Sequence, residues 1–123
     1  MDNVLDEYSR VMKIIKNKII PFGDFLAINL FDYVFTKREL KDYQQRHEEI
    51  HSAQMRELLY IPFYILYVLE FIIKFPIHKF NWDETYKSIS FEREAYYYQD
   101  WSYYISYREK YAWRRFVFKK SGC

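Results

Sequence analysis

HEEIH, residues 47–51, lies in the middle of a stretch from Lys37 to about Tyr60 whose apolar and metal-facing positions recur at helical spacing. Residues four apart share one face of a helix, so the imidazoles of His47 and His51 can bind one Zn²⁺ ion together. Glu48 follows the first histidine, where a carboxylate can take a proton from a water activated by that metal. The chain has only three histidines. Two of them at this spacing therefore predict a long helix that presents a metal-binding face.

The predicted helix has a start signal and a stop signal. Thr36-Lys37-Arg38-Glu39 has the form of a capping box, in which the threonine oxygen accepts from an early helical amide and the glutamate reaches back to the cap. Pro62 ends or kinks the helix, because proline lacks an amide hydrogen and clashes with the preceding turn. Proline also suits the first turn of a helix, so a second helix is predicted from Pro62 to Phe75. Pro76 is predicted to end it.

The rest of the chain predicts a small strand layer and further helices. Three stretches are interpreted as short strands: residues 11–20, 25–31 and 33–35. The first can also extend a helix, and the last two can also form one bent strand. Two later helices are expected, from about Trp82 to Gln99 with a break near residues 88–90, and from about Ser102 to Phe116. The predicted fold class is therefore α+β and mostly helical, with a small β layer of two or three strands before the long helix.

The composition fits one domain. The chain has 123 residues, and we place a single domain at residues 11–123 after a polar, poorly anchored segment at residues 1–10. Half of the residues are apolar and 23% are aromatic, with two glycines and three prolines, which argues against disorder and against a turn-rich all-β fold. Cys123 is the single cysteine and no secretory signal is visible, so a reducing, cytoplasmic location is expected.

Two stretches bear on membrane binding. The longest apolar run, Ile61 to Phe75, is interrupted by Glu70 and Lys74 and is too short to span a bilayer comfortably. We interpret it as a buried core helix in preference to a segment lying on a membrane. Residues 108–120 are basic and aromatic, and we interpret them as a packed terminal helix. Peripheral membrane association is left open, whereas nucleic acid is not an expected partner, because no nucleic-acid motif accompanies the charge.

Two histidines do not complete a catalytic zinc site, which takes three protein ligands and leaves one position open. The remaining histidine, His78, lies in a connector after Pro76 and is a poor candidate. FEREAY, residues 91–96, is a better source, because a later helix packed against the first would bring a carboxylate to the metal. That carboxylate is Glu92 or Glu94.

The two motifs together resemble the gluzincin metallopeptidases, which carry HExxH on one helix and an E-x-x-A-type run on a later helix. The resemblance covers roughly residues 27–99 and is closest to the short single-domain minigluzincins and to the soluble core of membrane peptidases related to β-lactam sensors. It implies that His47 and His51 are paired zinc ligands. It also implies that Glu92, three residues before Ala95, is the third ligand.

The same resemblance implies further roles. Glu48 would be the general base, and a strand at residues 27–31 would hold the substrate by β-augmentation. Several relatives have an aspartate that braces a motif histidine, four residues after the third ligand, where this chain has Tyr96. Tyr96 and Arg93 are both candidates to donate a hydrogen bond to the developing oxyanion. Gln54 lies one turn from the motif face, where it would orient a ligand or simply pack.

The expected function is that of a zinc-dependent peptidase or peptidase-like hydrolase whose substrate is a peptide or protein. The alternative is a non-enzymatic interaction module with a structural or vestigial metal site. In that case the aromatic and basic C-terminal stretch would bind a partner, nucleic acid or a membrane surface.

Overall fold

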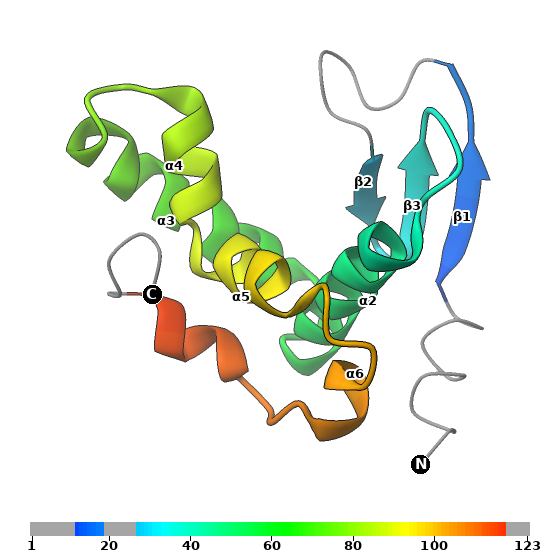
Figure 1. Ribbon diagram of the computed structural model, residues 1–123. Helices are drawn as coiled ribbons and strands as arrows, with labels where there is room; N and C mark the ends of the chain where they lie inside the picture. Colours follow the sequence, from blue (N-terminus) through cyan, green and yellow to red (C-terminus); the bar gives the residue numbers. More distant parts are fainter. Residues whose placement is uncertain (1–11, 19–26, 118–123) are drawn as a thin grey trace.

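The computed structural model describes residues 12–18 and 27–117 (Figure 1). Three short strands come first: β1 (Lys13–Lys16), β2 (Ala27–Leu30) and β3 (Tyr33–Thr36). The helices follow: α2 (Asp42–Glu57), α3 (Ile61–Ile77), α4 (Trp82–Ser88), α5 (Ser90–Tyr98), α6 (Tyr104–Tyr107) and the 3-10 helix η1 (Ala112–Phe116). The sheet lies at one side of the molecule, α3 and α4 lie at the other, and α2 and α5 lie between them (Figure 1). The mostly helical α+β class is confirmed, whereas the prediction for residues 1–10 lies outside the described residues.

The sheet has the order β1-β3-β2, so that β2 is an edge strand. β1 pairs in parallel with β3, and β2 pairs antiparallel with it through a two-residue turn. Phe31 (φ 54°) and Asp32 (φ 71°) both have positive φ, as a type I′ hairpin turn requires. The side-chain amide of Asn29 in β2 donates to the hydroxyl of Ser52 (2.8 Å) and to the carbonyl of Glu48 (3.1 Å) in α2. These bonds fix the edge strand against the helix that carries the histidine motif.

α2 is the central element of the fold. It contacts β2, α3, α5 and α6, and every residue from His47 to Met55 is buried. Its apolar side chains join two core clusters, with Ile50 packed against α5 and α6, and Met55 packed against Phe63 of α3 and Phe91 of α5. Most of the buried residues of α2 are polar, so their side chains require partners inside the protein.

α2 begins later than the sequence indicates. Its first residue is Asp42, and the amide of the N-cap Lys41 donates to the side-chain oxygen of Gln44 (2.9 Å). Thr36 instead belongs to β3, and its hydroxyl donates to the carbonyl of Arg38 (2.6 Å). The capping box predicted at residues 36–39 is therefore wrong, because the threonine closes a turn after the strand.

The two prolines lie close to the predicted helix boundaries. The chain bends by 111° between α2 and α3, with positive φ at Leu59 (60°) and Tyr60 (68°) in the bend. Pro62 lies in the first turn of α3, as predicted. Pro76 lies inside α3, which ends at the next residue.

The C-terminal part differs from the prediction in one respect. The predicted break near residues 88–90 is confirmed, since α4 ends at Ser88 and α5 begins at Ser90. The single helix predicted at residues 102–116 is wrong, because α6 and η1 are separate. Between them the buried side chain of Arg108 pairs with Glu57 of α2 (2.9 Å) and with Glu94 of α5. These ion pairs replace the continuation of the helix.

α3 is not the buried core helix that the sequence suggests. Phe63 is its only buried residue, and the other residues of α3 are partly or fully exposed. Within the described residues, no single helix has the length and apolar character needed to cross a bilayer.

Candidate metal centre

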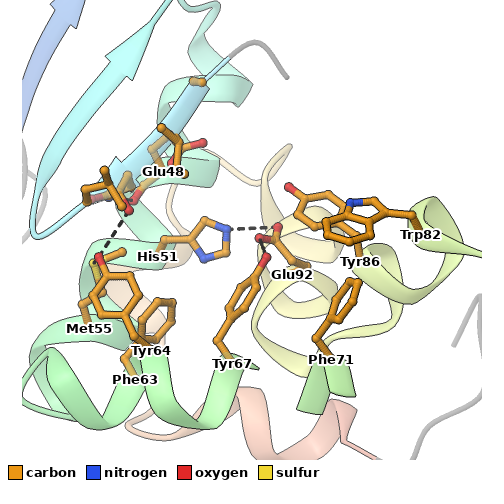
Figure 2. A pocket seen from close by; sticks show the side chains of 14 residues that line it. Glu48, His51, Met55, Phe63, Tyr64, Tyr67, Phe71, Trp82, Tyr86 and Glu92 are labelled. Carbon is orange, nitrogen blue, oxygen red and sulfur yellow. Dashed lines mark hydrogen bonds and ion pairs between the residues drawn. The ribbon is translucent and has the colours of Figure 1, made fainter. Parts of the chain in front are cut away.

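Three potential ligand atoms converge between α2 and α5. The Nε2 atoms of His47 and His51 are 3.1 Å apart. Oε1 of Glu92 lies 3.2 Å from Nε2 of His47 and 3.1 Å from Nε2 of His51. Figure 2 shows His51 and Glu92 pointing toward each other at the cleft. All three residues are buried, and their ligand atoms form a nearly equilateral triangle.

This triangle fits a zinc ion. Bonds of about 2.0–2.1 Å at tetrahedral angles hold neighbouring ligand atoms about 3.3–3.4 Å apart. The observed separations of 3.1–3.2 Å are close to that value. Two imidazoles and one carboxylate are also a donor set that catalytic zinc sites use, with the fourth position open.

Gln54 determines which nitrogen of His51 can bind a metal. The amide nitrogen of Gln54 donates to the carbonyl of Phe91 (3.0 Å) and to Glu94 (3.0 Å), which fixes the orientation of the amide. Its oxygen therefore faces Nδ1 of His51 at 2.8 Å. Nδ1 must carry the proton to make this bond, so the lone pair of Nε2 points to the centre of the triangle. Of the two roles considered for Gln54, orientation of a ligand is the one that the contacts support.

Gln99 has the same relation to His47. Its side-chain oxygen lies 2.9 Å from Nδ1 of His47. Tyr96 contacts the same imidazole through its ring, with centroids 4.5 Å apart. Gln99 was not among the predicted site residues, although Glu92, Tyr96 and Gln99 have the i, i+4, i+7 spacing that places residues on one helix face.

The carboxylate of Glu92 is held in one orientation. Its second oxygen, Oε2, accepts a hydrogen bond from the hydroxyl of Tyr67 in α3 (2.7 Å). Glu94, the other candidate for the third ligand, instead accepts from Tyr104 (2.6 Å) and from Arg108 (3.0 Å). The structure therefore brings Glu92 to the histidines and turns Glu94 toward α6 and the segment after it.

The electrostatics of the centre favour a positive charge. Burial opposes ionisation of Glu92, but His51 and His47 together hold the pKa of this carboxyl well below its usual range. Burial likewise opposes protonation of His51, yet the Glu92 carboxylate raises the pKa of this imidazole to about 9. Three lone pairs that meet at one point repel one another unless a cation or a proton lies among them. The centre therefore attracts either a cation or a proton.

Glu48 lies beside the three potential ligand atoms. It is 8% exposed and lines the same cleft as His51 and Glu92. Burial raises the pKa of Glu48 against the lowering effect of the two histidines. A carboxylate with a raised pKa accepts a proton more readily, as general-base catalysis requires.

The centre opens onto a cleft of about 320 Å³ between β2 and the helices. One wall is the edge strand β2, from Ala27 to Leu30. The other wall is largely aromatic: Phe63, Tyr64, Tyr67, Phe71, Trp82 and Tyr86 (Figure 2). The cleft thus combines an edge strand, a largely aromatic wall and two of the three potential ligand residues, His51 and Glu92.

The two residues predicted as oxyanion donors, Arg93 and Tyr96, have different surroundings. The guanidinium of Arg93 donates to the carbonyl of Phe116 (3.0 Å), at η1. Tyr96 is 42% exposed and is hydrogen-bonded with Tyr86, which lines the cleft and was missed by sequence analysis. Burial and the nearby Glu92 raise the pKa of Tyr86 far above its usual value, so this phenol stays protonated.

No protein-family model, curated protein or solved structure matches this chain.

Proposed function

We propose that this chain is a zinc-dependent peptidase or peptidase-like hydrolase. The observation that carries the proposal is the convergence of His47, His51 and Glu92 on one point, beside Glu48 and a cleft. The bonds from Nδ1 of each histidine to a glutamine oxygen support it further, because such bonds orient histidines that bind metals. The resemblance of the two motifs to those of gluzincins agrees with this arrangement.

The residues of the chain have separate roles in the proposed reaction. A zinc ion held by His47, His51 and Glu92 would supply Lewis acidity for hydrolysis of a peptide bond. Glu48 takes a proton from the attacking water and passes it to the leaving amine. The phenol of Tyr96 is the candidate donor to the oxygen of the scissile carbonyl, where negative charge develops.

The walls of the cleft favour an extended peptide as the substrate. β2 is an edge strand that lines the cleft, so an extended peptide can pair with it through main-chain hydrogen bonds. Asn29 ties this strand to α2, the helix that carries Glu48 and both histidines. The aromatic wall facing β2 suits an apolar side chain of the peptide.

Metal analysis and peptide hydrolysis test the proposal. Protein purified without chelator should hold about one zinc ion per chain, and His47→Ala should remove it. Glu48→Gln should keep the zinc but lose hydrolysis of a quenched-fluorescence peptide library, at least about 100-fold, because the base is removed. Glu39→Gln, at an exposed position before α2, is the matched control and should leave both properties unchanged.

Two outcomes would overturn the proposal. Retained hydrolysis in Glu48→Gln would refute the role of this carboxylate. Zinc-loaded wild-type protein that cleaves no peptide in the library would refute the hydrolase and favour a structural metal site.

A further inference from the structure

The polarity of α3 is inverted relative to a helix that faces water. Six of its residues are aliphatic and 54–69% exposed: Ile61, Ile65, Val68, Ile72, Ile73 and Ile77. The other exposed residues of this helix are leucines and prolines. The outward face, which we call the α3 outer face, therefore carries no charged or hydrogen-bonding side chain along its whole length.

The charged residues of α3 point into the protein instead. The side chains of Glu70 and Lys74 are 13% and 16% exposed and form an ion pair of 2.6 Å. Glu70 also accepts from the amide and the hydroxyl of Ser90, each at 2.7 Å, and Lys74 donates to the carbonyl of Ser88 (2.7 Å). A helix on a surface that faces water has the opposite arrangement, with its charged residues outward and its aliphatic residues inward. The inversion indicates that the α3 outer face meets an apolar medium.

The α3 outer face is larger than the apolar patches common on soluble monomers. Leu66 and Leu69 bring the exposed aliphatic side chains of this helix to eight. At about 100 Å² each they amount to roughly 800 Å², whereas the largest patch on a typical monomer is about 300–600 Å². The exposed residues Ile61, Ile65, Val68 and Ile72 are three or four positions apart, so they share one side of this helix of 17 residues, which is about 25 Å long.

Its chemistry suits lipid better than a protein partner. Protein interfaces form about one hydrogen bond per 100–200 Å² and are enriched in aromatic residues and arginine. The α3 outer face has neither such residues nor free hydrogen-bonding groups, and acyl chains require none. The segment after the C-terminal end of α3 has three exposed residues, Lys79, Phe80 (67%) and Trp82 (61%). A lysine with a tryptophan is typical of residues that lie at lipid headgroups.

We propose that α3 lies in the plane of a lipid bilayer, with its outer face in the boundary between headgroups and acyl chains. An in-plane helix buries its apolar face by about 5–10 Å and keeps its other face on the polar side. Here the other face packs on the protein through Phe63, Glu70 and Lys74. This geometry requires no spanning segment.

Flotation of the full-length protein with vesicles tests the proposal. Wild-type protein should float with phosphatidylcholine vesicles, and more strongly when phosphatidylserine is included, because of the basic residue beside the helix. Ile65→Gln combined with Ile72→Gln should weaken partitioning about tenfold or more. Both positions are more than half exposed, so the melting temperature should not fall. Ile14→Gln combined with Ile15→Gln, at exposed positions of β1, is the matched control and should float like the wild type.

The readouts separate this proposal from the proposed function. Zinc content of the α3 variant should equal that of the wild type, since neither position contacts the metal centre. Equal flotation of the α3 variant and the wild type would overturn the membrane proposal. So would a dimer in sedimentation experiments that the same variant dissociates, with no flotation of the wild type, because the face would then cover a second copy of the chain.

Discussion

Gln99→Leu isolates the contribution of one hydrogen bond to metal binding. Its side-chain oxygen lies 2.9 Å from Nδ1 of His47 and holds that imidazole with Nε2 toward Glu92. Leucine is similar in size but cannot accept, so His47 loses both its fixed orientation and part of its basicity. The main-chain carbonyl of Gln99, which accepts from Arg46 (2.6 Å), is unaffected by the substitution. The perturbation is therefore confined to the support of one ligand.

The expected loss is 10–100-fold in zinc affinity, the range typical of partners that orient metal-bound histidines. This corresponds to about 1.4–2.7 kcal/mol. Gln99→Glu should instead keep or increase the affinity, because a carboxylate accepts the same hydrogen bond and makes the imidazole more basic.

Competition with a chromophoric chelator measures the zinc dissociation constant of each variant. Asp100→Asn is the control, since Asp100 is the exposed neighbour of Gln99, and it should match the wild type. An affinity of Gln99→Leu within twofold of the wild type would refute the reasoning, provided that the metal-free proteins melt at the same temperature. It would mean that packing alone, such as the ring contact with Tyr96, orients His47.

Two further predictions concern stability. Glu92 raises the pKa of His51 from 6.5 to about 9 in the metal-free protein, so protonated His51 stabilises the fold below pH 6.5 and this contribution is lost as the pH rises through 9. In the presence of a chelator, the melting temperature should therefore fall as the pH rises from 6.5 to 9. Zinc binding should strengthen over the same range, because it needs the neutral imidazole. A melting temperature in chelator that does not change with pH would contradict this prediction. Arg108→Met should lower the free energy of unfolding by about 3–5 kcal/mol in urea titrations, since it leaves two buried carboxylates without their cation. A loss below about 1 kcal/mol would show that these carboxylates find other partners.

The local features of the fold could be predicted from sequence. The helical spacing around His47 predicted α2, and Pro62 predicted the end of that helix and the first turn of α3. The break between α4 and α5 was also predicted. These features depend on side-chain periodicity and on the missing amide of proline, which act within a few residues.

The features that sequence analysis misjudged depend on distant contacts. Arg108 interrupts the last predicted helix because its partners come from α2 and α5. Gln99 braces His47 across 52 positions of sequence. The exposure of α3 was missed because hydrophobicity alone does not distinguish a helix in a core from one that faces outward. Pairing of the two motif histidines with Glu92 was anticipated through a resemblance, and no local pattern would have chosen it over Glu94.

Gln54 connects the candidate metal centre to the C-terminal part of the fold. His51 is oriented by Gln54, Gln54 is held by Glu94, and Glu94 is held by Arg108. A substitution at Arg108, which is not one of the three residues of the triangle, should therefore also disturb the orientation of the His51 imidazole.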